Sequence, residues 1–311
     1  MYNPLVSIVM PLYNGSNYVA QAIDCALAQT YQNVEIIVVN DGSTDGGAGR
    51  DICLSYGDKI RYFEKQNGGC ASALNYGIRQ AKGEFISWLS HDDLYDKEKI
   101  AAQIECYQKY SLDPQKTIIS TPCRVIDENG ELIPRPKLPK CRNLDSRQMF
   151  QFLLLTTNVN GCGLLIPKQL FENGVYFRED LRFVLDWNLW LKFAVYGAHM
   201  FVDDRILVSI RMHSQQVTVK QSDRRAPEVT ENTAELFELL KKLNLPEYIQ
   251  ILYFYSISTN EVISKDIKRY MKENRISTKP FKKINYILKI KGKEFAKHIY
   301  RIYRKAARIG K

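Results

Sequence analysis

Short hydrophobic runs alternate with amphipathic segments along the first third of the chain. Four runs are rich in β-branched and aromatic residues and end in polar ones, as strands do: 5–13, 34–41, 59–64 and 84–90. Helical spacing of hydrophobic residues follows in the gaps, over 19–27, from near 42–46, and over 70–83. This alternation predicts an α/β protein with an open, mostly parallel sheet whose ligand lies at the carboxyl ends of the strands.

The pattern continues less regularly to about residue 220. Helices are predicted at 97–110 and 186–197, and strands at 117–127, 161–167 and 204–213. The segment 133–140 contains three prolines and is predicted to be a loop. After Gln221, strand signals fade and lysine-rich sequence of helical character takes over, which predicts a helical, basic extension over 221–311.

The composition is that of a soluble protein, with 45% hydrophobic and 25% charged residues in 311. Seven cysteines form no C-x-x-C pair, and an odd number cannot all pair within one chain, so free thiols in a reducing cytoplasm are expected. The N-terminus has no basic region before a hydrophobic run, and no stretch reaches the length of a membrane span. We therefore expect a cytoplasmic protein.

The net charge of +10 comes from one end of the chain. Residues 265–311 hold 17 Lys and Arg against 3 Asp and Glu, which leaves 27 against 31 in the rest. Within this end, 293–309 has an apolar face and a basic face, the pattern of a helix that lies on an anionic membrane surface. Packing of the apolar face on protein is an equal alternative. Nucleic-acid binding is not expected, because no recognition motif accompanies the charge.

Polar residues follow three of the predicted strands, where a parallel sheet would gather them. They are Asn40 and Asp41, then Asn67 with two glycines, then Asp92 and Asp93. The loop after the first strand has no G-x-G-x-x-G and the chain has no P-loop, so neither a typical NAD site nor a P-loop site is indicated. Adjacent carboxylates suit Mg²⁺ or Mn²⁺, which would neutralise bound phosphates. A turn or helix cap is the competing interpretation of Asp92 and Asp93.

At these motifs the sequence resembles a family, the inverting glycosyltransferases of family 2, which have the GT-A fold. The resemblance begins in "VSIVMPLYNGSNYVAQAIDCALAQTYQNVEIIVVNDGSTD" and continues in "NGGCASALNYGIRQAKGEFISWLSHDD". Later, "VLDWNLWLKFA" and "SIRMHSQQVT" are similar to its acceptor-side motifs. The matching pieces stand in order over roughly residues 5–218, which makes the set specific although each piece is weak.

The resemblance implies a nucleotide-sugar site. Asp41 would accept a hydrogen bond from N3–H of uracil or thymine, a contact that suits an acceptor-only carboxylate. The small residues at the start of the helix after 69 would let the sugar diphosphate approach the helix N-terminus. The residues carried over to this site are Pro11, Tyr13, Asn14, Asp41, Lys65, Asn67, Gly69, Ala71 and Asp92.

The resemblance also implies a metal site and a catalytic base. The family's D-x-D-D is here "SHDD", with Ser90 in place of the first aspartate. Asp92 takes the position of the main metal ligand for Mn²⁺ or Mg²⁺, with Asp93 and His213 as the other expected ligands. Asp186 matches the base that deprotonates the acceptor hydroxyl. One base is sufficient because the leaving diphosphate is stabilised by metal.

These implications define an expected enzyme and its organisation. Residues 1–112 would bind the nucleotide sugar, 113–220 would face the acceptor, and 221–311 would form the basic helical extension. The enzyme would transfer one sugar from a UDP-sugar, with a dTDP-sugar as the second choice, to a hydroxyl of a glycan or lipid-linked glycan during surface polysaccharide assembly at the inner face of the membrane. The alternative is a non-catalytic protein that binds sugar nucleotides or glycans through a decayed GT-A site.

Overall fold

The computed structural model of the protein describes residues 2–134, 143–155, 159–172 and 174–214, together with Gln216, Glu228 and Glu235. All of these lie in Met1–Leu245, the first of two compact units into which the chain divides. The second unit, Pro246–Lys311, lies outside the described residues, and so does the amphipathic segment 293–309. The predicted basic extension over 221–311 therefore stays a prediction.

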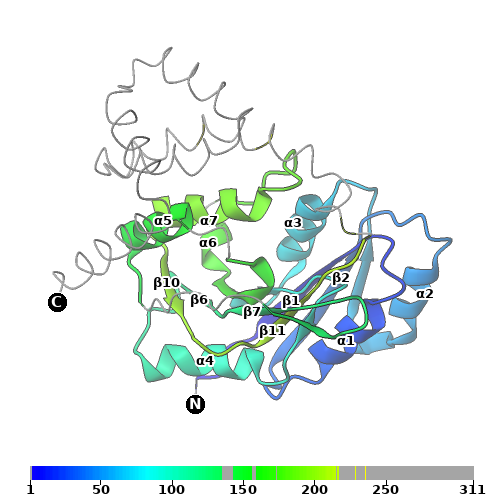
Figure 1. The fold of residues 1–311 in the computed structure, drawn as a ribbon, viewed down its shortest axis with the longest axis horizontal. Coiled ribbons are helices and arrows are strands. Elements are labelled where there is room, and N and C mark those ends of the chain that lie inside the picture. The colour runs from blue at the N-terminus through cyan, green and yellow to red at the C-terminus, as the bar shows by residue number, and fades with distance from the viewer. Residues whose placement is uncertain are drawn as a thin grey trace, which may run out of the picture. The chain divides into compact units, whose positions relative to one another are not determined.

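A mostly parallel sheet forms the centre of the described structure (Figure 1). Its strands run in the order β10, β6, β9, β4, β1, β2, β3. Their bounds are β1 Val6–Leu12, β2 Val34–Asn40, β3 Arg61–Glu64, β4 Phe85–Trp88, β6 Thr117–Ser120, β9 Leu164–Pro167 and β10 His199–Val202. β9 is antiparallel to both of its neighbours, and the other pairs are parallel. The expected open, mostly parallel α/β sheet is confirmed.

A smaller sheet pairs strands that are distant in sequence. It has the order β5, β11, β7, β8, with bounds Leu94–Tyr95, Val208–Arg211, Cys123–Ile126 and Leu132–Ile133. β11 is parallel to β7 and antiparallel to β5, so the segment that ends at Arg211 lies beside the segment that follows Asp93. This pairing brings the predicted metal motif next to the predicted His213.

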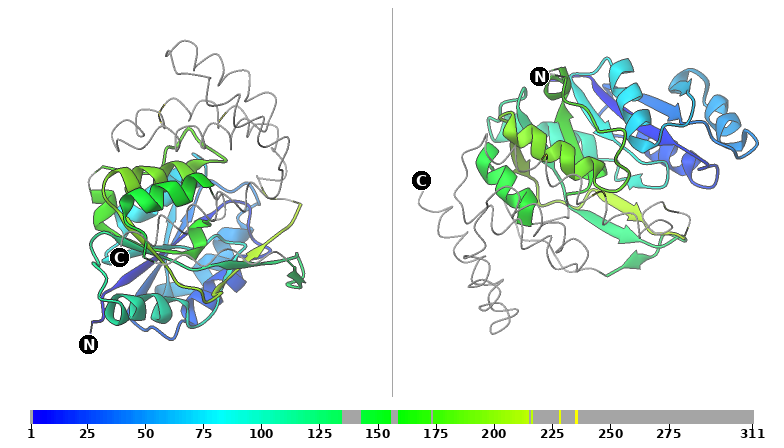
Figure 2. Two further views of the ribbon diagram at one scale, coloured as in Figure 1. Left: turned by 60° about the vertical axis from the view of Figure 1, so that its left-hand side comes forward. Right: turned by 90° about the horizontal axis from the view of Figure 1, so that it is seen from above.

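The helices cover the two faces of the large sheet. Their bounds are α1 Val19–Leu27, α2 Ala48–Ser55, α3 Cys70–Gln80, α4 Lys99–Lys109, α5 Ser146–Leu155, α6 Gln169–Glu172 and α7 Leu185–Val195. α3, α5, α6 and α7 lie on one side of the sheet and α1 and α4 on the other, as the views in Figures 1 and 2 agree. The buried face of α1 is fully apolar and consists of Val19, Ala22, Ile23 and Ala26.

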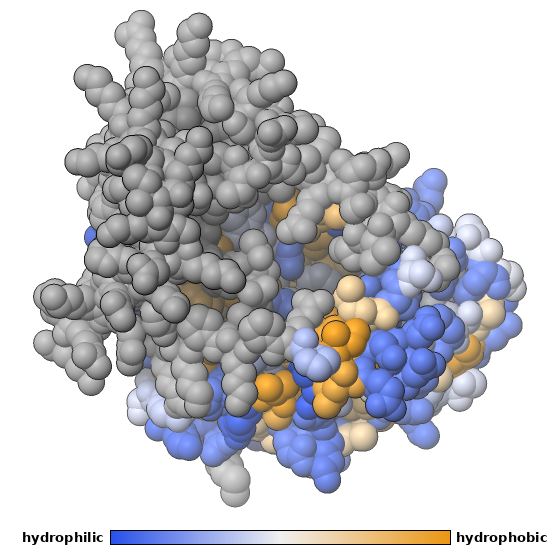
Figure 3. All heavy atoms as spheres, in the orientation of Figure 1, coloured by the Kyte–Doolittle hydropathy of each residue, from blue (hydrophilic) through white to orange (hydrophobic). Residues whose placement is uncertain are grey.

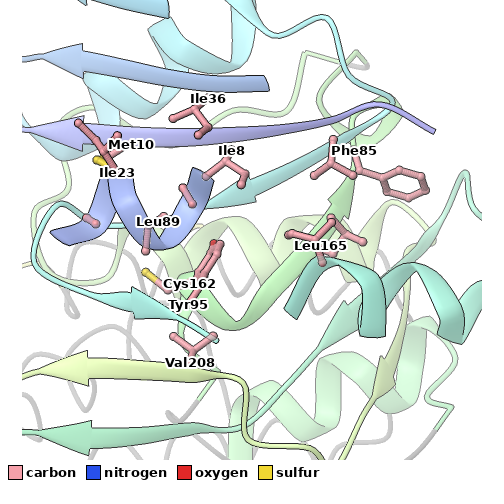
Figure 4. Packing of buried hydrophobic residues seen from close by; sticks show 14 of the residues in the cluster. Ile8, Met10, Ile23, Ile36, Phe85, Leu89, Tyr95, Cys162, Leu165 and Val208 are labelled. Carbon is pink, nitrogen blue, oxygen red and sulfur yellow. The ribbon is translucent and has the colours of Figure 1, made fainter. Parts of the chain in front are cut away.

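One hydrophobic cluster joins the two sheets with helices α1, α2 and α4. Ile8 and Met10 of β1 pack with Ile23 of α1 and Phe85 of β4, and Val208 of β11 lies at the far side of the same cluster (Figure 4). All of these side chains are buried. Burial of this kind is the main favourable term in folding, so the strand ends that carry polar residues are held on a rigid base.

Several element boundaries differ from the sequence prediction. The single strand predicted at 117–127 is two strands, β6 and β7, which belong to different sheets. The break comes at Thr121 and Pro122, because proline has no N–H for the ladder and Thr121 instead bonds the backbone of Gly163. The pattern did not predict the short strands β5, β8 and β10 or the helix α5, and 161–163 is a 3₁₀ turn before β9.

The described surface is largely hydrophilic in the orientation of Figure 3, with hydrophobic residues in limited groups. Leu132 of β8 is the most exposed of the large hydrophobic side chains described. Six described cysteines are free, in agreement with the expected absence of disulfides among them. No helix in the described ranges combines the length and hydrophobicity needed to cross a membrane.

Candidate active site

Asp41 is the centre of a tight cluster at the end of β2. Its carboxylate accepts hydrogen bonds from the Lys65 ammonium (2.8 Å) and from the backbone N–H groups of Gly68 (3.0 Å) and Gly69 (2.6 Å). Asn67 donates its side-chain amide to the Asp41 carbonyl at 2.8 Å. Four residues that the sequence placed in one nucleotide site therefore do lie together, with the Asp41 side chain almost fully buried.

The loop after β1 closes the next part of the site. Asn14 has a left-handed backbone (φ 49°), and its side-chain oxygen accepts from the Thr44 N–H at 2.7 Å. Tyr13 beside it is 43% exposed, whereas Pro11 is buried. Exposure leaves the Tyr13 ring available to a ligand, as the nucleotide prediction requires. The Asn14 side chain connects its own loop to the loop after Asp41. This contact fixes the distance between the two loops.

Asp92 and His213 meet across the site. The His213 Nε2 atom lies 3.0 Å from Asp92 Oδ2, and both side chains are largely buried. Gln216 approaches the same oxygen at 3.5 Å. Nδ1 of His213 has no hydrogen-bond partner in the described part of the chain, and Tyr18 packs against the ring with 5.1 Å between centroids. Two of the three predicted metal ligands are thus neighbours.

Asp93 faces the interior instead. One carboxylate oxygen accepts from the Arg211 N–H at 2.9 Å, and the other lies 3.2 Å from the Cys162 thiol. Burial and, after it, the negative charge of Asp92 raise the pKa of the Asp93 carboxyl to about 8. Both oxygens are engaged by the protein, so Asp93 ties its loop to β11 and to Cys162, and its predicted role as a metal ligand stays a prediction.

Ser90, which stands where the family has its first aspartate, also faces Cys162. Its hydroxyl and its N–H each lie 3.4 Å from the Cys162 sulfur. The departure from the family pattern is therefore accommodated by a contact inside the protein.

Arg211 fastens the metal motif to the rest of the molecule. Its buried guanidinium donates to the carbonyls of Asp92 (3.0 Å) and Glu128 (3.0 Å) and to the Gln21 side chain (2.9 Å). It also lies 4.6 Å from the centre of the Tyr18 ring. Buried charge is tolerated where its donors are all paired, and here the pairing holds β11, α1 and the Asp92 loop in one arrangement.

Asp186 lies in the first turn of α7, at the end of the loop 177–186. Its Oδ1 accepts from the Trp187 N–H at 2.6 Å. Further back in the loop, the buried Asn75 of α3 donates to the Phe177 carbonyl (2.9 Å) and accepts from the Phe177 N–H (3.1 Å). This exchange ties the predicted base loop to the helix that starts at the Asp41 cluster.

Cys70, the first residue of α3, shows that the three predicted carboxylates converge. Burial and, after it, the negative charges of Asp92, Asp186 and Asp41 raise the pKa of the Cys70 thiol to about 12, against a lowering effect of Arg182. Each of these groups is therefore within electrostatic reach of one side chain. Ala71, predicted to border the diphosphate, follows Cys70 and is fully buried, so it acts by its small volume.

Four residues near the site were not found from the sequence. Arg182 donates to the Gly68 carbonyl at 2.8 Å, Glu228 accepts from the backbone N–H groups of Arg182 (2.8 Å) and Phe183 (2.7 Å), and His91 stacks over Gly15. Cys70 belongs to the motif "NGGCASALNYG", and Arg182 stands four residues before Asp186. Neither position in the sequence indicates that the residue contacts the site. Only the packing of distant segments reveals these neighbours.

Comparison with known proteins identifies relatives of this arrangement. The family described as Glycosyl transferase family 2 matches residues 7–174. An uncharacterized glycosyltransferase of Rickettsia felis is 47% identical over 223 residues, 72% of this chain but 36% of its own length. One of Rickettsia typhi is 43% identical over 273 residues, 88% of this chain and 81% of its own. The chain thus spans about a third of the first relative and most of the second.

Solved structures share the fold at low sequence identity. Staphylococcus aureus TarS 1–349 in complex with UDP-GlcNAc has a TM-score of 0.65 at 18% identity, covering 82% of this chain and 74% of TarS. The mannosyltransferase PcManGT from Pyrobaculum calidifontis, in complex with GDP-Man and Mn²⁺, has a TM-score of 0.57 at 18% identity, covering 98% and 83%. The GT-A expectation for the fold is confirmed by these neighbours.

Proposed function

The chain belongs to glycosyltransferase family 2 and carries the transferase domain of that family, and on this premise we propose that it moves one sugar from a UDP-sugar to a hydroxyl of a glycan or lipid-linked glycan. A dTDP-sugar is the second choice of donor. The transfer inverts the configuration at the anomeric carbon and depends on Mn²⁺ or Mg²⁺.

The observation that carries this proposal is the gathering of Asp41, Asp92 and Asp186 around the start of α3. They come from the ends of β2 and β4 and from the start of α7, which are far apart in sequence. Ligands of open α/β sheets bind at the carboxyl ends of the strands. A decayed site would have no reason to keep three carboxylates, which repel one another, in one place.

The Asp92 and His213 pair fits a divalent cation. Oδ2 of Asp92 and Nε2 of His213 lie 3.0 Å apart, and these two atoms would hold the ion. Within the described residues no group of three or more His, Cys, Asp or Glu side chains is arranged to hold a metal. Mg²⁺ is commonly held by one or two protein ligands together with substrate phosphates, so the pair is sufficient.

The bound ion would supply positive charge to the leaving diphosphate. The other tasks fall to the protein's own groups. Asp41 accepts from the base through the carboxylate that Gly68 and Gly69 hold in place, with Tyr13 beside it. Asp186 takes the proton of the acceptor hydroxyl as that oxygen attacks the anomeric carbon.

The choice of uracil over other bases rests on the chemistry of Asp41. A carboxylate accepts hydrogen bonds and cannot donate, so it suits the N3–H of uracil or thymine and not the N3 of cytosine. Binding of UDP-GlcNAc by TarS, which has the same fold, is in keeping with this choice. The GDP-Man complex of PcManGT shows that the fold also serves a guanine donor, so guanine is part of the test.

The acceptor and the place of action are proposed on more general grounds. A transferase that adds one sugar per encounter, in assembly of a surface polysaccharide, would meet its acceptor at the inner face of the cell membrane. The excess of lysine and arginine in residues 265–311 would favour an anionic lipid surface. The protein would then act in the cytoplasm, with peripheral attachment through that end of the chain.

Calorimetric titration tests the donor class directly. The protein is titrated with UDP, dTDP, GDP, CDP and ADP, each with Mn²⁺ and with a chelator. We expect UDP to bind most tightly, dTDP next, and both to lose affinity in chelator. If no nucleotide binds with Mn²⁺ present, the proposal is overturned in favour of a non-catalytic protein with a decayed site. Ser90, which replaces an aspartate of the family motif, is the feature that favours this alternative.

A further inference from the structure

Arg182 lies next to the Asp41 cluster, but its guanidinium does not pair with the Asp41 carboxylate. Its guanidinium lies on the Gly68–Gly69 turn and donates from Nη1 to the Gly68 carbonyl at 2.8 Å. A Cβ atom added at Gly69 would stand 1.2 Å from that nitrogen, so the absence of a side chain at residue 69 makes room for it. The arginine thus reaches from the base loop, 177–186, onto the turn that begins α3.

The guanidinium has donors to spare. It carries five N–H groups, and its one recorded contact in the described part of the chain is the Gly68 carbonyl. No carboxylate there forms an ion pair with it, whereas Lys65 is paired with Asp41 at 2.8 Å. The side chain is also exposed, and Glu228 fixes its backbone rather than its charge.

The electrostatic surroundings call for such a cation. The charged groups that act on Cys70 at the start of α3 are Asp92, Asp186 and Asp41, which are negative, and Arg182, which is positive. A diphosphate entering this place would add negative charge to an excess of it. Lys65 is already ion-paired with Asp41, so it offers little compensation for the charge of a diphosphate. The bound metal and Arg182 are the positive charges left to neutralise it.

We propose that Arg182 binds the diphosphate of the donor. The inference rests on the proposed function, since it assumes a nucleoside diphosphate donor. Arginine suits this task because its planar fork bonds two phosphate oxygens at once. Because Arg182 belongs to the same loop as Asp186, its contact with the diphosphate also fixes the loop that carries the base when donor is bound.

The test compares ligands that differ in phosphate. Uridine, UMP and UDP are titrated with Mn²⁺ into the full chain and into Arg182→Gln, Arg182→Lys and Arg50→Gln. Arg50 is the matched control, because its exposed guanidinium pairs with Asp51 on α2. We expect Arg182→Gln to weaken UDP binding about 10- to 100-fold, in line with loss of a charge-assisted hydrogen bond. Uridine affinity should stay within about twofold, and Arg182→Lys should fall between.

The outcomes separate this inference from the proposed function. If the unaltered protein binds UDP and Arg182→Gln binds it equally well, Arg182 does not hold the diphosphate and the proposed function stands. If uridine and UDP lose affinity equally, Arg182 has a structural role and the inference also fails. If another nucleotide binds in place of UDP, the same titrations are made with its nucleoside, monophosphate and diphosphate, and the same two comparisons decide the role of Arg182. If no nucleotide binds the unaltered protein, the proposed function and this inference fail together.

Discussion

The donor side of the site, formed by Asp41, Lys65 and 67–69, and the base side, formed by 177–186, are built by different means. On the donor side, the backbone of Gly68 and Gly69 holds the Asp41 carboxylate at the end of a strand whose last five residues are buried. On the base side, side chains of other segments hold the loop in place. Asn75 holds Phe177, and Glu228 holds the backbone at 182 and 183.

The difference matters for what substitutions will do. Backbone contacts survive the exchange of most single side chains, whereas a loop held by a few distant side chains depends on each of them. Substitutions on the base side, apart from those of Arg182, should therefore disturb this loop while leaving nucleotide binding unchanged. Asp92 and His213 belong to neither side, because Asp92 follows β4 and His213 follows β11.

The largest expected effect separates chemistry from donor binding. Asp186→Asn should lower the rate of sugar transfer about 10²- to 10⁴-fold, because an amide cannot take the acceptor proton. Nucleotide affinity should change by less than about threefold, since the proposed partner of Asp186 is the acceptor hydroxyl and not the nucleotide. Transfer is measured with the donor that titration identifies, and affinity by calorimetry. Asp180→Asn, an exposed change in the same loop, serves as the control, and transfer at the unaltered rate in Asp186→Asn would rule out the base assignment.

The next effect distinguishes two adjacent aspartates. Asp92→Asn should lower Mn²⁺-dependent UDP affinity at least about tenfold. Even substitution of a residue that only hydrogen-bonds to a metal ligand commonly lowers metal affinity by that factor. Asp93→Asn should change it less than about threefold, because the Asp93 oxygens are engaged by Arg211 and Cys162. Calorimetry with Mn²⁺ and with chelator measures both. Equal losses in the two variants would show that Asp93 is also a ligand.

Loss of the Asn75 side chain should destabilise the base side. Asn75→Ala leaves the buried N–H and carbonyl of Phe177 without their partner, which should reduce the free energy of unfolding by about 2–4 kcal/mol. Urea denaturation measures the change. Asn33→Ala is the control, because that side chain makes an exposed bond to the Asn3 carbonyl. A loss no larger than the control would contradict the view that Asn75 anchors the loop.

The smallest expected effect concerns Lys99, which lies between β4 and β9. Its ammonium donates to the Ser87 hydroxyl (2.8 Å) and the Leu164 carbonyl (3.3 Å). Burial lowers the pKa of Lys99 from its usual value to about 7. The unfolded chain therefore binds an extra proton between pH 10.5 and 7, and the stability of the folded protein falls as pH falls through that window.

Lys99→Met should remove this pH-dependent penalty. Ser87 and Leu164 still bond each other in the variant, and Ser87 also bonds Tyr95. The stability of Lys99→Met relative to the unaltered protein should rise by about 2 kcal/mol between pH 9 and pH 7, as measured by urea denaturation. Lys109→Met, at an exposed position, should show no such change. A difference that is independent of pH would mean that Lys99 keeps its proton in the folded state.

The first half of the fold followed closely from the hydrophobic pattern. β1, β2 and α3 lie within one to three residues of the predicted bounds, since buried parallel strands and amphipathic helices leave strong periodic signals. Beyond residue 113 the pattern was less informative. β6 and β7 were merged into one strand, because both are hydrophobic and only their partners, β9 and β11, assign them to different sheets.

The candidate site divides in the same way. Residues at strand ends could be grouped from topology alone, and Asp41, Lys65, Asn67 and Gly69 are in direct contact. Asp92 and Asp93 could not be told apart, because neighbours in sequence point in different directions and only the surrounding atoms show which one is enclosed. Arg182 was missed because its contact with Gly68 spans more than a hundred residues.

The sequence by itself determined the first half of the sheet, the helices of that half and the strand ends where polar groups collect, because burial of apolar residues at periods of two and 3.6 dictates these locally. Only the tertiary structure decided what each polar group does. Arg211 and Cys162 engage Asp93, His213 meets Asp92, and Arg182 donates to Gly68, since such contacts depend on packing between distant segments. The proposals that Asp92 holds the metal and that Arg182 holds the diphosphate rest on that packing.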